Sequence, residues 1–245
     1  MLNQFSRTEI LLGKEAMKKL KNSRVAVFGI GGVGGYTVEA LARSGVGTLD
    51  IIDNDKICLT NVNRQIYALT TNIGQYKTDV AVERIKQINP SAVVNAHKVF
   101  FTPENAFEFD FKAFDYVVDA VDTVTAKLAL VQSSVSAGIP IISSMGAGNK
   151  LNPTAFEVTD IYKTSVCPLA RVMRYELKKR GIKKLKVVYS KEKPITPIKY
   201  SEDNSNPEID GSSIRRSVPG SNAFVPPVVG LIIASEVIKD LTTMN

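Results

Sequence analysis

The feature that most constrains the fold is a glycine-rich turn between a short apolar run and an amphipathic segment. Residues 25–28 (Val-Ala-Val-Phe) are typical of a buried parallel strand, and residues 36–44 are typical of a helix. The turn between them contains Gly29, Gly31, Gly32 and Gly34. This spacing permits a tight bend and a close approach of phosphate to the helix N-terminus, whose free amides and dipole attract negative charge. By itself, the pattern is a weak signal.

Strand and helix patterns alternate after this turn. We expect strands at residues 49–52, 93–99, 116–121 and 139–143, and helices at residues 79–88 and 125–137. The alternation predicts a Rossmann-like, doubly wound α/β fold, in which a mostly parallel sheet has helices on both faces. Its ligand crevice is expected beyond the carboxyl ends of the strands.

The rhythm changes after residue 148. Strands are expected near Phe156 and Val187, a helix at residues 166–179, and a polar loop at residues 199–221. We therefore expect one domain over residues 1–245, with a nucleotide-binding core at about residues 20–148 and a C-terminal extension at about residues 149–245.

Polar side chains at the end of the second strand indicate which nucleotide binds. Asp53 follows the glycines at about the 20-residue spacing at which nucleotide-binding folds place an acid on ribose hydroxyls, although Asp53 could instead cap the crossover. Further donors and cations come from Asp55, Asn61, Arg64, Gln65 and Lys77. Two cations and several donors exceed what the diphosphate of NAD requires, whereas a triphosphate does require them. The pattern favours ATP, with the simpler alternative that Arg64 and Lys77 are surface cations.

These residues resemble the nucleotide site of the ubiquitin-activating-enzyme-like (ThiF/MoeB/HesA) adenylating superfamily. The resemblance extends over nearly the whole chain, from Phe5-Ser6-Arg7 to the last helix. Within the superfamily, the chain is most similar to the branch that dehydrates threonylcarbamoyladenosine in tRNA. That similarity rests on the segment from Asp53 to Ile66, on Gly146-Ala147-Gly148 and on Pro168-Leu169-Ala170.

The resemblance implies a homodimeric, AMP-forming enzyme of the ligase type that uses ATP and Mg²⁺. Asp122 matches the aspartate that holds magnesium in the superfamily, and Arg7 matches the arginine that a neighbouring subunit inserts at the phosphates. The simpler alternatives are a helix N-cap for Asp122 and a frayed tail around Arg7. The predicted catalytic residues are Arg7, Arg64, Lys77 and Asp122. The predicted nucleotide-binding residues are Gly29, Gly31, Gly32, Gly34, Asp53, Asp55, Asn61, Arg64, Gln65 and Lys77.

The few thiols favour chemistry without a covalent protein intermediate. Cys58 and Cys167 are the only cysteines, too few for a four-cysteine zinc site, and they indicate no disulfide framework. Cys167 could form an acyl intermediate, but nothing nearby in sequence lowers its pKa, so a structural role is preferred. The single histidine, His97, is likewise expected to be structural. A substrate carboxylate is already ionised at pH 7 and can attack the α-phosphate itself.

Charge and hydropathy indicate the partners and the compartment. The net charge of +7 suggests a polyanionic partner, here tRNA, and a sulfur-relay or cysteine-desulfurase partner remains open. Six cations within residues 178–186 fit either RNA contact or a solvated helix end. The apolar residues 223–234 include Pro226 and Pro227 and are too short to span a membrane. Together with the absence of a leader pattern, this predicts a cytoplasmic protein.

Several functions remain open at this point. The preferred one is ATP-dependent dehydration of threonylcarbamoyladenosine in tRNA. The alternatives are adenylation of a small sulfur-carrier protein and a non-catalytic nucleotide- and RNA-binding module. An NAD oxidoreductase fits least, because of residues 61–65.

Overall fold

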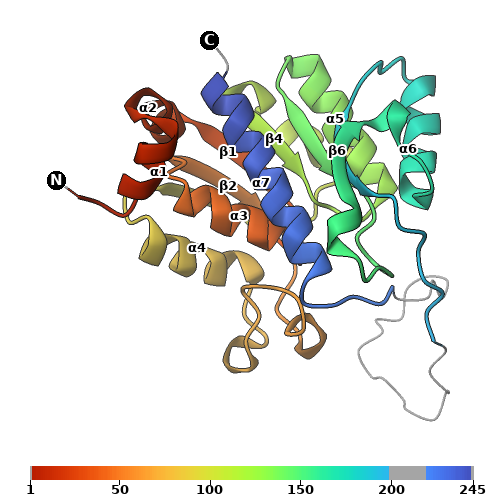
Figure 1. Cartoon of the computed structure of the whole chain (residues 1–245), viewed down its shortest axis with the longest axis horizontal. Coiled ribbons are helices and arrows are strands. Elements are labelled where there is room, and N and C mark those ends of the chain that lie inside the picture. Colours follow the sequence, from red (N-terminus) through yellow and green to blue (C-terminus); the bar gives the residue numbers. More distant parts are fainter. Residues whose placement is uncertain (1, 199–218, 244–245) are drawn as a thin grey trace.

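The computed structural model describes residues 2–198 and 219–243. In this part of the chain a central sheet has seven strands in the order β3-β2-β1-β4-β5-β7-β6 (Figure 1). All neighbouring strands are parallel except β6 and β7. The strands are β1 (Arg24–Phe28), β2 (Thr48–Ile52), β3 (Val93–His97), β4 (Tyr116–Asp119), β5 (Ile141–Ser144), β6 (Phe156–Asp160) and β7 (Lys186–Ser190).

Helices cover both faces of this sheet, which confirms the predicted doubly wound α/β class (Figure 1). The α3, α4 and α7 helices lie on one face, and α5 and α6 on the other. The α-helices of the described residues are α1 (Ser6–Leu12), α2 (Lys14–Asn22), α3 (Gly34–Arg43), α4 (Lys77–Ile88), α5 (Val124–Ala137), α6 (Pro168–Lys179) and α7 (Val225–Thr243).

The central strand β1 shows why the apolar run folds this way. Its side chains alternate between the two faces, so Val25 and Val27 enter the core under α3 and α7, whereas Ala26 and Phe28 enter the core under α5 and α6. A strand buried on both faces is apolar throughout, as parallel strands between helices are. The chain leaves β1 toward β2 on one side and later returns to β4 on the other, which opens a crevice at the carboxyl end of β1.

The C-terminal part of the chain extends the same sheet. β7 pairs with β5 and β6 pairs with β7, after which α7 returns to pack against α3. The two helices come very close, because a Cβ on Gly230 would lie 2.3 Å from the carbonyl oxygen of Val33. Pro226 and Pro227 occupy the first turn of α7, where a missing N–H is tolerated, so they do not interrupt the helix. Among the described residues, no helix combines the length and hydropathy needed to cross a membrane.

Some predicted boundaries were wrong. The residues around Arg7, for which the simpler alternative was a frayed tail, form α1. The helix expected from residue 166 starts at Pro168, because Val166 has a φ of 46° that a helix cannot contain. Of the predicted polar loop, residues 199–218 lie outside the described part of the chain.

A partly buried ion pair between β1 and β2 makes the stability of the fold depend on pH. Asp50 of β2 is fully buried and accepts hydrogen bonds from Arg24 at 2.7 and 2.9 Å, and its Oδ1 lies 3.2 Å from His97 Nε2. Burial alone raises the pKa of Asp50, but the hydrogen bonds from Arg24 and His97 outweigh it and bring the pKa to about 2. The carboxylate therefore stabilises the folded state above its unfolded pKa of about 4, and this contribution is lost as pH falls toward 2.

We expect the free energy of unfolding to fall by about 2 kcal/mol between pH 4 and pH 2 on account of Asp50. Urea denaturation of the wild type and of Asp50→Asn, each at several pH values, measures this contribution. The difference in stability between the two proteins should shrink over that interval. A difference that stays constant from pH 5 to pH 2 would contradict the assignment.

Candidate functional site

A pocket of about 420 Å³ lies at the carboxyl ends of β1, β2 and β4, where the topology opens the crevice. Ten of the predicted site residues line it: Gly29, Gly31, Gly32, Asp53, Asp55, Asn61, Arg64, Gln65, Lys77 and Asp122. Two predicted residues, Gly34 and Arg7, are not part of this lining. The sheet thus brings together residues from widely separated parts of the chain.

The glycine turn is shaped by close backbone contacts. Gly29 has a φ of 81°, and a Cβ there would lie 2.7 Å from the carbonyl oxygen of Ala120. A Cβ on Gly34, the first residue of α3, would lie 1.8 Å from the oxygen of Gly29. Gly34 therefore shapes the turn from behind, whereas Gly31 and Gly32 face the pocket. The turn presents its backbone to the pocket at the N-terminus of α3, where an anion is stabilised.

Asp53 fixes the end of β2 to this turn. Its Oδ2 accepts a hydrogen bond from the Ile30 backbone N–H at 2.9 Å, and its Oδ1 accepts one from the Asp55 N–H at 2.9 Å. Burial raises the pKa of Asp53, and the positive charge of Lys77, 3.7 Å away, opposes that rise. The carboxylate thus sits between the glycine turn and a cation, at the position expected for contact with a ribose.

The two cations of the pocket, Lys77 and Arg64, differ in whether a carboxylate of the described residues neutralises their charge. Lys77 is buried, and its Nζ lies 2.6 Å from Asp55 Oδ2. Arg64 forms no ion pair with any described residue; its guanidinium donates to the Thr60 carbonyl oxygen at 2.8 Å and to Asn63 Oδ1 at 2.9 Å. Arg64 consequently carries an uncompensated charge beside the glycine turn, as a phosphate-binding arginine should.

Asn61 and Gln65 come from the same short turn. Asn61 Oδ1 accepts the Cys58 N–H at 3.2 Å, and the Asn61 carbonyl oxygen accepts the Gln65 N–H at 2.9 Å. These bonds hold the turn that begins at Leu59 and place the Gln65 side chain next to Gly31. Part of the Asn61 side chain therefore has a structural role.

Asp122 follows β4 and is exposed at the pocket. The alternative that it caps the next helix is wrong, because the N-cap of α5 is Thr123, which makes no side-chain capping bond. Behind it lies a buried network that the sequence patterns did not predict. Asp119 accepts hydrogen bonds from Ser143 Oγ and from Lys127 Nζ, the latter at 3.1 Å, and also from the Val121 N–H at 3.3 Å. This network fixes the backbone that leads to Asp122.

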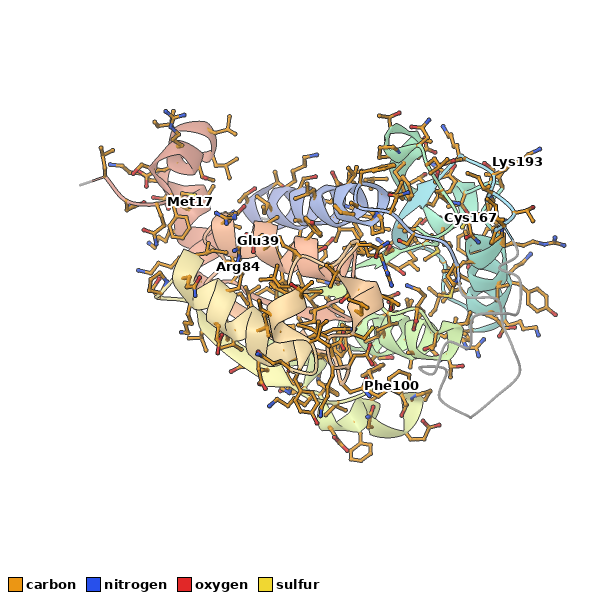
Figure 2. The ribbon with its side chains drawn as sticks, turned by 90° about the horizontal axis from the view of Figure 1, so that it is seen from below. Met17, Glu39, Arg84, Phe100, Cys167 and Lys193 are labelled. Carbon is orange, nitrogen blue, oxygen red and sulfur yellow. The ribbon has the colours of Figure 1, made fainter. Side chains whose placement is uncertain are left out.

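Arg7 lies at the other end of the sheet. Phe5, just before α1, packs near Gly45, which precedes β2, whereas the pocket lies beyond the end of β2. Five residues of strand separate those ends by about 17 Å. Figure 2 likewise shows Met17 of α2 well apart from Phe100, which lines the pocket. Arg7 is exposed and cannot reach the pocket of its own chain in this conformation.

The cysteines and the histidine lie outside the pocket lining. Cys167 is buried at the start of α6, apart from Phe100 in Figure 2, and Cys58 Sγ lies 3.1 Å from Thr60 Oγ1. His97 bonds Asp50 and packs beside Phe109. These placements support the structural interpretation of all three residues.

The basic segment at residues 178–186 also lies away from the pocket. β7 is parallel to β5, so its first residue, Lys186, lies at the amino ends of the strands, whereas the pocket lies at their carboxyl ends. Lys186 Nζ contacts Asp240 at 2.7 Å, and Arg180 pairs with Glu176 at 2.5 Å. These carboxylates neutralise part of the segment. For Arg180 this favours a solvated helix end over RNA contact, and Lys186, in β7, is held by an ion pair within the chain.

Sequence patterns missed part of the pocket wall. Residues 219–221, next to α7, form one side, and Asn63 Nδ2 donates to the Ser221 carbonyl oxygen at 3.1 Å. Residues 99–101, after β3, form another side. Neither segment carries a recognisable motif, although Gly146-Ala147-Gly148, which the resemblance singled out, does contribute Ala147 and Gly148.

Comparison with known proteins agrees with this geometry. The ThiF family model matches residues 5–245. A tRNA threonylcarbamoyladenosine dehydratase of Bacillus subtilis (strain 168) is 47% identical over 246 residues, covering 98% of this chain and 95% of that protein. The structure of Escherichia coli tRNA N6-threonylcarbamoyladenosine dehydratase, TcdA, in complex with ATP superposes with a TM-score of 0.86 at 35% identity, over 97% of this chain and 93% of the other. The complex of that enzyme with AMP has a TM-score of 0.85 at the same identity and coverage. The chain therefore belongs to the ThiF family and, within it, to the tRNA threonylcarbamoyladenosine dehydratases.

Proposed function

We propose that the protein uses ATP to dehydrate N6-threonylcarbamoyladenosine next to the tRNA anticodon, which gives the cyclic form of this nucleoside. One observation carries the proposal: the pocket combines a glycine turn at a helix N-terminus with the exposed Asp122 and with Arg64, which has no carboxylate partner in the described part of the chain. The relatives supply the substrate, because the similar proteins are named as dehydratases of this nucleoside. Since tRNA is the substrate, we place the protein in the cytoplasm.

The chemistry consists of two transfers. The threonyl carboxylate, which is ionised at pH 7, attacks the α-phosphorus of ATP, and pyrophosphate leaves. The neighbouring ureido group then attacks the activated carbonyl, which closes a five-membered ring, loses a proton and expels AMP. The oxygen lost from the carboxylate leaves on AMP, so the nucleoside loses one water. Arg64, Lys77 and the backbone of the glycine turn position the phosphates and stabilise their charge.

Asp122 fits a magnesium ion that is shared with the nucleotide. The described residues contain no group of three metal-ligating side chains, so these residues alone do not form a complete metal site. Magnesium commonly takes one or two carboxylates and completes its shell with phosphate oxygens and water. When bound, the ion would neutralise phosphate charge, with Asp122 as its protein ligand.

A homodimer would explain where Arg7 acts. The α1 helix buries none of its side chains, and Ile10 and Leu11 are more than four-fifths exposed. Apolar side chains exposed on so short a helix are suited to burial against a second copy. Docking of α1 on the partner would bring Arg7 to the phosphates in the partner's pocket. Arg7 cannot reach the phosphate site of its own subunit.

Nucleoside mass spectrometry tests the proposal. The protein should convert threonylcarbamoylated tRNA to a product lighter by one water when ATP and magnesium are present. Omitting ATP, or supplying NAD in its place, should leave the substrate unchanged. Unconverted tRNA after incubation with folded, ATP-binding protein would contradict the proposed substrate.

If the protein instead activated a sulfur-carrier protein through a cysteine, removing its cysteines would abolish activity. If ring closure needs no protein thiol, the double variant Cys58→Ala/Cys167→Ala should turn over within a few-fold of the wild type. Because Cys167 is buried in the core, the melting temperature of the variant serves as the control for folding. Loss of activity in a folded double variant would favour covalent transfer.

A further inference from the structure

A lysine that the proposed chemistry does not use is buried behind the pocket wall. Lys127 lies near the start of α5, its side chain is 1% exposed, and it does not line the pocket. Its Nζ donates to Asp119 Oδ1 at 3.1 Å and to the Ser144 carbonyl oxygen at 2.7 Å. Apolar residues of similar volume often stabilise a core at least as well as a buried ion pair, so stability alone does not account for this lysine.

The buried ammonium group joins the ends of two neighbouring strands. Asp119 is the last residue of β4 and pairs with Ser143 of β5, whose hydroxyl also donates to the Asp119 carboxylate. Ser144 is the last residue of β5. Residues 120–122, directly after β4, and residues 147–148, shortly after β5, line the pocket. One side chain therefore ties together the bases of two segments of the pocket wall.

The segment that follows β4 is held from two sides. On one side, Asp119 Oδ1 accepts the Val121 N–H at 3.3 Å. On the other side, the Ala120 backbone packs against the glycine turn, where a Cβ on Gly29 would lie 2.7 Å from the Ala120 carbonyl oxygen. Asp122 comes next in the chain. Its place relative to the glycine turn therefore depends on how Asp119 is held.

We propose that Lys127 is a positioning residue for the reaction: by holding Asp119 it sets the place of Asp122, and thereby the place of magnesium on the nucleotide. The inference rests on the proposed metal role of Asp122. Lys127 and Asp119 carry opposite charges, so the pair orients Asp122 without adding net charge behind the pocket. Groups that orient a metal ligand from behind commonly contribute about 10- to 100-fold to metal affinity or activity.

Calorimetric titration of ATP measures this role. The magnesium ratio is the ATP dissociation constant in EDTA divided by that in magnesium. Lys127→Met should lose most of the wild-type magnesium ratio, as Asp122→Asn does, while binding ATP in EDTA like the wild type. At saturating ATP, kcat for tRNA dehydration should fall by about 10- to 100-fold. Lys127→Arg keeps a buried cation that can donate to both oxygens, so it should recover part of the ratio and of kcat.

Arg24→Met is the matched control for lost stability. It leaves the fully buried Asp50 without its arginine partner, much as Lys127→Met leaves Asp119 without its lysine, but Arg24 lies at the start of β1, away from the pocket. Its melting temperature should fall, whereas its magnesium ratio should not change. If Lys127→Met does not fold, the double variant Lys127→Met/Asp119→Asn removes both charges of the pair, and the same titrations apply to it.

The other outcomes overturn the inference. A folded Lys127→Met protein with the wild-type magnesium ratio and kcat would leave Lys127 with a role in stability alone. An equal loss of ATP affinity in magnesium and in EDTA would mean that the substitution had altered the pocket as a whole. A wild-type magnesium ratio in Asp122→Asn would contradict the proposed metal role itself, and this result does not depend on any variant of Lys127.

Discussion

Replacing Asp122 with Asn should lower the rate of tRNA dehydration by about 100-fold or more. The change keeps the size of the side chain and removes the charge that would hold magnesium on the phosphates. Losing one preorganised electrostatic contact at a reacting phosphate commonly costs this much. Asp122 is exposed and makes no capping bond, so the fold should survive the change. Single-turnover kinetics with saturating ATP measures the effect.

The magnesium dependence of ATP binding is the sharper readout. Wild-type protein should bind ATP more tightly with magnesium than with EDTA, whereas Asp122→Asn should show a much smaller difference. Arg64→Ala should weaken ATP in both conditions, because Arg64 lines the pocket without a carboxylate partner among the described residues. Arg171→Ala is the matched control, because Arg171 is exposed on α6 and outside the pocket lining. An Asp122→Asn protein with full magnesium dependence would refute the metal role.

Mixing two inactive variants should restore activity. Arg7→Ala and Asp122→Asn proteins should each be nearly inactive, since each lacks one group at every site. In a mixed dimer, the subunit with intact Asp122 receives an intact Arg7 from its partner. One of the two sites of the mixed dimer is therefore complete. Random exchange between equal amounts should recover about a quarter of wild-type sites in a two-fold dimer.

The position of α1 makes this experiment decisive. Arg7 lies at the opposite edge of the sheet from its own pocket, so it serves a partner's site or none. Native mass spectrometry must first verify that mixed dimers form. Verified mixed dimers that dehydrate no tRNA would contradict the shared site. The variant Lys18→Ala, which changes an exposed cation on α2, controls for nonspecific loss of charge at this end of the molecule.

The sequence predicted much of the pocket lining where its signals were local. The glycine turn, Asp53 and residues 61–65 each follow a strand within a few residues, and the order of parallel strands brings such ends together. The alternation of strands and helices along the chain predicted the doubly wound class, because this pattern is also local in sequence.

The remaining features depend on contacts between distant segments. No local pattern shows that residues 219–221 contact Asn63, or that Lys186 pairs with Asp240. The role of Phe100 as a pocket residue was missed because exposed and buried phenylalanines alternate around it without a motif. The α1 helix was missed because it is short and buries no side chain, so it lacks the apolar periodicity that predicts a helix.

The packing of α7 has a consequence for how the protein is made. Val225, Val229, Ile233 and Val237 of this helix complete the core that also contains β1 and α3. The Thr37 hydroxyl donates to the Gly230 carbonyl oxygen across 193 residues of sequence. While the ribosome is still synthesising the chain, β1 and α3 therefore have an uncovered apolar surface, and the nucleotide pocket lacks the wall next to α7. Folding to the ATP-binding state must wait until α7 has been synthesised, so the nascent chain is a natural client for chaperones that shield apolar surfaces.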